Sequence, residues 1–413
     1  MNIPMLRPDD SVLYLDPNLE LEICKNGELE DLTYKHHAKS SPLHLTLVKI
    51  WINFHIAYLA WKAYKSIKKV RLISQYFKEF NQKLYTNQKR RKYVKKGGQY
   101  LVGMYIPPFP SQNFDRLVLT EMNNVIPHNL PKNTYQQVNF AITTKCPMRC
   151  EHCFEWDNLN LKESFSLEAL KKIVGTLQKN GLGQISLSGG EPMVRFKEML
   201  ELISSSSKTS AWWVLSAGFG LNEEKAKALK EAGTTGVVIS LDHYEPDLHN
   251  QFRGYKGAFD HAIKGIHAAN SAGLFVALSV CLTKFTANRY FLYRYAALAN
   301  ELEVDFIQWL EPKAEGHYRG KDVLLSEGHI SILEEVYEEL NNSKEHQKAP
   351  QVLYHGYYQR RLGCLSGGKY SLYIDARGMV HSCPFCHSGD FHIMDMLNMP
   401  VIGKGKVTKC ESY

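Results

Sequence analysis

Between residues 137 and 310 the chain holds six short apolar segments, most of them followed by a segment with apolar residues at helical spacing. The short segments predict strands at residues 137–143, 184–192, 211–218, 236–242, 274–281 and 304–310. The longer segments predict helices at residues 166–180, 222–232, 258–272 and 289–302. Such alternation requires a parallel sheet covered by helices. We therefore predict an α/β fold, a partial (β/α)6 barrel, whose function lies on the loops after the strands.

The loop after the first predicted strand contains three cysteines, Cys146, Cys150 and Cys153, with the spacing C-x3-C-x2-C. So short a loop can turn all three sulfurs toward one soft metal centre. Thiolates favour zinc, copper(I) or iron–sulfur clusters. A [4Fe–4S] cluster needs four ligands, so this loop would leave one iron open to a non-protein ligand. A structural zinc site is the alternative, although such sites usually have C-x2-C pairs and four protein ligands.

Two further motifs follow predicted strands. The second strand runs into the turn Gly189-Gly190-Glu191-Pro192. Glycine lets the backbone approach a ligand closely, and a carboxylate suits an ammonium group. The fourth strand ends at Ser240-Leu-Asp242, and an acidic turn then leads to Arg253-Gly254. Taken alone, Asp242 would cap a turn and Arg253 would form a surface ion pair.

Together these motifs resemble the radical S-adenosylmethionine (SAM) superfamily over residues 136–410, and more narrowly its members with a C-terminal SPASM or twitch extension. The resemblance implies that the three loop cysteines hold a [4Fe–4S] cluster whose open iron is chelated by SAM. Reduction would cleave SAM to methionine and a 5′-deoxyadenosyl radical, which abstracts a hydrogen atom. The residues that the resemblance assigns to SAM are Gly189, Gly190, Glu191, Pro192, Ser240 and Arg253.

The match has one departure, because this chain has His243 where the family usually has glycine after the strand aspartate. Ser216, Ala217 and Ser279 are further candidates for the SAM wall, on their strand-end positions alone.

Four more cysteines lie in the last fifty residues: Cys364, Cys383, Cys386 and Cys410. The spacing from Cys364 through Gly378 to Cys383 fits the C-x(9–15)-G-x4-C pattern of SPASM and twitch domains. A hairpin turned at residues 375–378 lies between these cysteines. Four cysteines imply one auxiliary [4Fe–4S] cluster, closed by protein ligands, with an electron-relay or structural role. A four-cysteine zinc ribbon is the alternative.

The two remaining cysteines are predicted to be structural. Cys24 is a strand residue, and Cys281 on the fifth strand is a buried core thiol. The alternative for Cys281 is a catalytic role, donating a hydrogen atom to a substrate radical. Clustered metal-type cysteines without a signal peptide favour a reducing cytoplasm over a disulfide framework.

The N-terminal third is basic. Residues 1–41 predict a small β-element, and residues 42–98 a long basic helix or helical hairpin. Its first half is apolar, but Lys49, Asn53 and His55 argue against a membrane span. Residues 61–97 contain thirteen Lys or Arg and one acid. This charge fits a solvated face, a docking surface for an acidic peptide, or an anionic membrane surface contacted through residues 43–96. We identify no nucleic-acid-binding module.

The remaining segments are predicted as a linker over 99–135, the barrel over 136–320, a helical connection over 321–363 and the cysteine-rich domain over 364–413. The expected function is radical modification of a peptide or protein, with an external electron donor such as flavodoxin or ferredoxin. The alternatives are a lipid or small-molecule substrate at the membrane surface, and a non-catalytic metal-binding interaction protein. We expect the protein in the cytoplasm or peripherally on the inner face of the membrane.

Overall fold

The computed structural model describes residues 42–84, 92–128, 135–364, 370–385, 389 and 391–397. The predicted β-element at 1–41 lies outside these residues, as do Cys24, Cys386 and Cys410.

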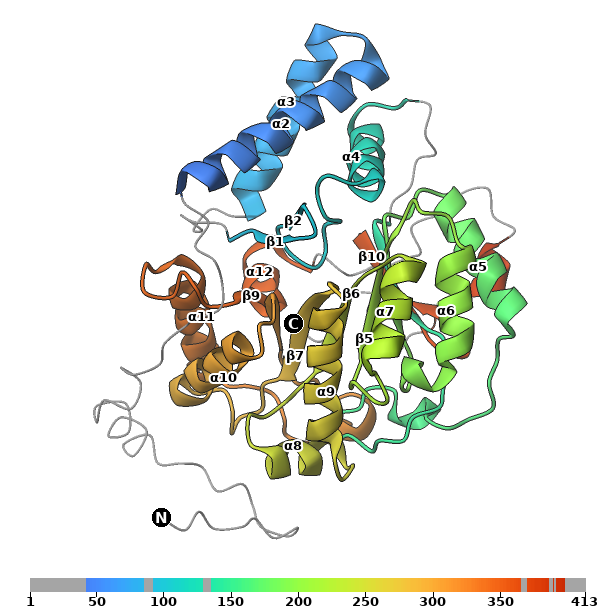
Figure 1. Cartoon of the computed structure of the whole chain (residues 1–413), viewed down its shortest axis with the longest axis vertical. Coiled ribbons are helices and arrows are strands. Elements are labelled where there is room, and N and C mark those ends of the chain that lie inside the picture. The colour runs from blue at the N-terminus through green and yellow to red at the C-terminus, as the bar shows by residue number, and fades with distance from the viewer. Residues whose placement is uncertain are drawn as a thin grey trace.

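A ten-stranded sheet organises the molecule (Figure 1), in the order β12-β11-β10-β3-β4-β5-β6-β7-β8-β9. Its parallel part consists of β3 Gln137–Ala141, β4 Gln184–Ser188, β5 Ala211–Ser216, β6 Thr234–Ser240, β7 Phe275–Cys281, β8 Phe306–Leu310 and β9 Gln351–Tyr354. The first six are the six predicted strands, so the predicted parallel α/β architecture is confirmed. Strand β9 extends the sheet beyond β8, within a region predicted to be a helical connection.

The helices that cover the sheet are α5 Leu167–Lys179, α6 Phe196–Ser205, α7 Glu223–Ala232, α8 Pro246–Arg253, α9 Ala258–Ser271, α10 Arg289–Glu301, α11 Glu327–Asn342 and α12 His355–Leu362. Side-chain caps fix where several of them begin. Ser166 accepts a hydrogen bond from the Ala169 N–H, and Asn222 accepts one from the Lys225 N–H. Such caps satisfy backbone donors that the first helical turn leaves unpaired. The apolar faces of these helices and of the sheet form the main core.

The N-terminal helices α2 Pro42–Tyr64 and α3 Ile67–Leu84 form a helical hairpin (Figure 1). Lys65, with a φ of +49°, lies at the break between them. The hairpin packs on α4 Gln112–Val125, which lies in the segment predicted as a linker. Strands β1 Val94–Lys96 and β2 Gln99–Leu101 replace the end of the predicted helix, because Gly97 and Gly98 adopt the positive φ of a two-residue hairpin turn.

Residues 92–106, the floor segment, fill the end of the sheet from which the parallel strands start. Leu101 and Met104 pack against Trp213, Phe275 and Phe306, and the last two are the first residues of β7 and β8.

Two lysines fasten the floor segment to the barrel. Lys92 Nζ donates to three backbone carbonyls, at 2.7–2.8 Å, between residues 340 and 349. Lys96 Nζ lies 2.8 Å from Asp305 Oδ2. These two lysines of the basic N-terminal segment therefore bond to barrel residues inside the fold.

The C-terminal segment joins the same sheet. Strands β10 Ser371–Ile374 and β11 Met379–His381 form the predicted hairpin, and β12 Phe391–His392 pairs with β11 before helix α13 Ile393–Met396. Strand β10 also pairs in parallel with β3. This region therefore extends the edge of the barrel sheet.

Candidate radical SAM site

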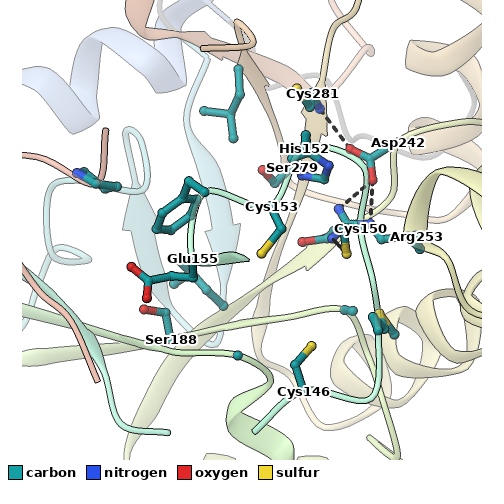
Figure 2. A pocket seen from close by; sticks show the side chains of 18 of the residues that line it. Cys146, Cys150, His152, Cys153, Glu155, Ser188, Asp242, Arg253, Ser279 and Cys281 are labelled. Atoms are coloured by element: carbon teal, nitrogen blue, oxygen red, sulfur yellow. Dashed lines mark hydrogen bonds and ion pairs between the residues drawn. The ribbon is translucent and has the colours of Figure 1, made fainter. Parts of the chain in front are cut away.

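The cysteine loop, residues 146–153, follows β3 at the carboxyl end of the sheet. The sulfurs of Cys146, Cys150 and Cys153 point into a common space (Figure 2), which is part of a cavity of about 270 Å³. Within the described part of the chain, no three His, Cys, Asp or Glu side chains are grouped to hold a single metal ion. A [4Fe–4S] cluster needs no such grouping, since each cysteine binds a different iron. The three sulfurs face one space, where each would bind a different iron of such a cluster.

Three glycines allow neighbouring segments to pack tightly against the cysteine loop. A Cβ at Gly190 would lie 2.4 Å from the Lys145 carbonyl oxygen. One at Gly254 would lie 2.5 Å from the Arg149 oxygen, and one at Gly316 would lie 2.3 Å from the Cys153 oxygen. All three contacts are too close for any other residue. The loop is thus held from three sides by backbone.

Backbone hydrogen bonds join the same loop to the end of α8. The Arg149 N–H donates to the Arg253 oxygen at 3.1 Å, and the Glu151 N–H donates to the Phe252 oxygen at 2.9 Å. Burial raises the pKa of Cys146 and Cys153 to about 12. The thiols therefore keep their protons near neutral pH until a metal displaces them.

Glu191 is buried and connects the Gly-Gly turn to the end of β5. Its Oε1 accepts hydrogen bonds from Ser216 Oγ at 2.7 Å and from the Met193 N–H at 3.0 Å. Its Oε2 accepts one from the Ala217 N–H at 2.8 Å. Burial raises the pKa of Glu191, and these three donors oppose that shift. The predicted SAM residues Ser216 and Ala217 thus position this carboxylate at the cavity.

Arg253, at the end of α8, forms a buried ion pair with Asp242 (Figure 2). Its Nη2 lies 2.5 Å and its Nε 2.6 Å from Asp242 Oδ2, and its Nη1 lies 3.6 Å from Cys150 Sγ. Burial raises the pKa of Asp242, but Arg253 acting together with His152, His249 and the Cys281 N–H outweighs that effect, and the net pKa is lowered. Sequence reasoning missed this pairing because it did not predict helix α8, which carries Arg253 at its end.

The other predicted SAM residues lie on neighbouring strand ends. Ser240 pairs in register with Ser279, and both line the cavity. Gly189 and Gly190 line it from the β4 side beside Ser188, whereas Pro192 begins a short 3-10 helix and is not among the lining residues. His243 is not among the lining residues, because its Nδ1 turns back to accept a hydrogen bond from the Glu245 N–H. The departure from the family pattern is thus accommodated outside the cavity.

Cys281 is buried, as predicted for a core thiol, and it also lines the cavity, as the alternative role of hydrogen-atom donor requires. Its side chain lies in the cavity wall, and its N–H donates to Asp242 Oδ1 at 3.0 Å. Burial raises the pKa of this thiol above its usual value. His152, which sequence reasoning did not single out, also lines the cavity and stacks on Phe252 with ring centroids 4.8 Å apart.

Of the four C-terminal cysteines, the structure describes Cys364 after α12 and Cys383 after β11. The residues after Cys383 reach the cavity, since Pro384 and Phe385 line it. The Phe385 ring also contacts the Phe154 ring, with centroids 5.7 Å apart. An auxiliary cluster remains a prediction, because Cys386 and Cys410 lie outside the described residues.

Residues 140–289 match the family model of the radical SAM superfamily. These residues therefore form a radical SAM domain, as the cysteine and Gly-Gly-Glu-Pro motifs predict. The match covers the cysteine loop and the part of the sheet from the end of β3 to β7.

Several curated proteins are similar in sequence. The Fe-coproporphyrin III synthase of Methanosarcina barkeri is 33% identical over 172 residues, which is 41% of each chain. The antilisterial bacteriocin subtilosin biosynthesis protein AlbA of Bacillus subtilis is 27% identical over 253 residues, 59% of this chain and 54% of AlbA. The AdoMet-dependent heme synthase of Oleidesulfovibrio alaskensis is 26% identical over 218 residues, 51% of this chain and 55% of that protein. The chain thus spans about half the length of these relatives.

Solved structures share the fold. SuiB of Streptococcus suis bound to S-adenosylmethionine aligns with a TM-score of 0.50 and 15% identity, covering 66% of this chain and 64% of SuiB. SuiB bound to the precursor peptide SuiA aligns with a TM-score of 0.51 and 14% identity, covering 75% of this chain and 72% of SuiB.

Proposed function

We propose that this protein is a radical SAM enzyme that abstracts a hydrogen atom from a peptide or protein substrate. The observation that carries the proposal is the convergence of three cysteine sulfurs, Glu191 and Arg253 on one cavity. Bound at the cysteine loop, a reduced [4Fe–4S] cluster and SAM would supply a 5′-deoxyadenosyl radical.

The protein's own residues would then bind and orient the reactants. In this proposal the carboxylate of Glu191 and the Gly189–Gly190 backbone receive the SAM amine. Ser240 and Arg253 contact its ribose or carboxylate. The floor segment closes the opposite end of the barrel, because Val238 both lines the cavity and packs against Leu101 and Met104. Excluding water in this way protects a reactive intermediate from side reactions.

A peptide substrate is supported by the biosynthetic role in AlbA's name and by the precursor peptide bound to SuiB. The charge of the cavity also supports it. Among the residues that the structure describes, its lining includes five carboxylates and two cations, Arg253 and Lys313; the carboxylates are those of Glu155, Glu191, Asp242, Glu311 and Glu315. An excess of carboxylates suits amide or cationic groups better than a polyanion.

A small-molecule substrate is the second candidate, favoured by the 33% identity to Fe-coproporphyrin III synthase. The predominantly acidic lining opposes a porphyrin that carries several carboxylates. Binding of Fe-coproporphyrin III, the product in that relative's name, followed by the change in its visible absorption, separates the two candidates. Tight binding of this porphyrin that SAM or the cysteine-loop variant alters would overturn the peptide assignment.

The enzymatic proposal is tested by anaerobic reconstitution with iron and sulfide, followed by reduction and addition of SAM. With an auxiliary cluster, about eight irons per chain are expected, falling to about four in a Cys146/Cys150/Cys153→Ala variant that no longer forms 5′-deoxyadenosine. Tightly bound zinc without SAM cleavage would leave a non-catalytic metal-binding protein instead.

A further inference from the structure

Helix α2 presents a continuous apolar stripe to solvent. We define the outer stripe as Leu43, Leu47, Ile50, Phe54, Tyr58 and Trp61, which recur at intervals of three or four residues. Residues three and four apart lie on one face of a helix. Their exposed fractions run from 45% for Ile50 and Trp61 to 73% for Phe54. An exposed apolar face of this length marks an interaction surface.

The opposite face of α2 is buried in the protein. Ile56, Leu59 and Ala60 pack in one cluster with Ile73 of α3 and with Phe114, Val118 and Met122 of α4. By length and composition Leu43–Tyr64 could cross a membrane, and 22% of the apolar window within it is buried in the fold. Because its inner face already contacts protein along this cluster, the outer stripe is suited to lie along a surface.

Positive charge lies at one end of the stripe. Residues 42–84 contain eight Lys or Arg and one acid, Glu79, a net charge of +7. Exposed cations gather where α2 turns into α3, namely Lys62, Lys65, Lys68, Lys69 and Arg71. Exposed Ile67 and Leu72 lie among them. Aromatic and aliphatic residues beside exposed lysines are typical of helices that lie in an anionic lipid interface.

From this combination we propose that the outer stripe and the cations of the α2–α3 turn bind the surface of an anionic lipid bilayer. Charge decides between this occupant and a second copy of the chain. A symmetric contact through the stripe would bring two hairpins of +7 together, whereas anionic lipid neutralises them. Lys92 and Lys96 take no part, since their ammonium groups are bonded inside the fold.

The hairpin lies at the end of the sheet where the floor segment packs (Figure 1), whereas the cysteine loop follows the carboxyl end of β3. A bilayer bound by the outer stripe would therefore leave the mouth of the cavity open to the aqueous phase. The inference does not depend on the chemistry at the cavity, and its test requires no cofactor.

The test is vesicle flotation of the full chain with phosphatidylcholine alone and with phosphatidylcholine containing one quarter phosphatidylglycerol. We expect flotation only with the anionic vesicles, and a decrease at high salt. Two variants should each lower the partition coefficient at least about tenfold, namely Leu47→Gln/Phe54→Gln and Lys62→Gln/Lys65→Gln/Lys68→Gln. For the lysine variant this follows from roughly 1 kcal/mol per lysine near the surface.

Matched controls alter exposed residues elsewhere. Leu324→Gln/Phe285→Gln changes the same two residue types, which are 53% and 39% exposed. Lys172→Gln/Lys197→Gln/Lys227→Gln removes three exposed lysines from α5, α6 and α7. Both controls should float like the wild type, and circular dichroism verifies folding of every variant. Failure of the wild type to float overturns the proposal. So does a stripe variant that floats normally, or one that instead converts a dimer to a monomer.

Discussion

At the scale of single residues, Gly254 places the cysteine loop. It ends α8 with a φ of +58°, and a Cβ there would lie 2.5 Å from the Arg149 carbonyl oxygen. Gly257, with a φ of +86° and no neighbour within 4 Å, is the matched control. Both Gly→Ala changes should cost about 1 kcal/mol for the left-handed backbone. Only Gly254→Ala should also lower the iron retained per chain after reconstitution, because it displaces the loop. Equal iron in the two variants would contradict this role.

The buried pair of Arg253 and Asp242 has a natural comparison in the exposed pair of Arg319 and Asp157. The first pair is nearly inaccessible, whereas the side chains of the second are 60% and 57% exposed. Asp242→Asn leaves a buried guanidinium uncompensated, so we expect a loss of about 3–5 kcal/mol in the free energy of unfolding. Asp157→Asn should lose less than about 1 kcal/mol. Urea unfolding of both variants measures the difference, and similar losses would refute the assignment.

Sequence reasoning identified the residue types at the site better than their contacts. The cysteines, Glu191 and Arg253 all line the cavity. The partners of Glu191 could not be predicted, because Ser216 and Ala217 come from β5, about 25 residues further along the chain. Such contacts depend on how neighbouring strands are set side by side, which periodicity does not determine.

At the scale of elements, β10 connects the C-terminal segment to the cysteine loop. Ile374 of β10 is fully buried and pairs with Phe140 of β3, and Tyr373 Oη donates to Glu155 Oε1 at 2.6 Å. Ile374→Ala should cost about 2–4 kcal/mol and speed amide exchange in the β3–β10 ladder before the β7–β8 ladder. The half-buried Met379 of β11 is the control, and Met379→Ala should cost less. Equal acceleration of amide exchange in all ladders of the sheet would argue against a local role of Ile374.

Part of the sheet escaped prediction. Strands β3 to β8 lie in apolar runs and β10 lies in the predicted hairpin, whereas β9 has only four residues and falls in a segment predicted to be helical. Short runs carry little periodic signal. Helix α4 was likewise missed because polar residues interrupt its apolar face, although Ser111 caps it by accepting a hydrogen bond from the Phe114 N–H.

At the scale of the whole molecule, buried neutral histidines predict acid sensitivity. Burial lowers the pKa of His249 and His355 to about 4, against about 6.5 in an unfolded chain. Between pH 6.5 and 4 the unfolded chain therefore binds protons that the folded chain does not, and stability falls as pH falls through this window. Each histidine should contribute on the order of 1–2 kcal/mol between pH 7 and 5. Thermal unfolding of His355→Gln across this range should show a shallower pH dependence than the wild type, and an unchanged slope would exclude His355 as a cause.

The floor segment has a kinetic consequence. Leu101 and Met104 occupy the end of the barrel beneath Val238, and Lys92 and Lys96 fasten this segment to the loops around it. The floor segment therefore closes this end of the cavity. For ligands that enter from the carboxyl ends of the strands, one seated against the floor must bind before one seated at the cysteine loop and must leave after it.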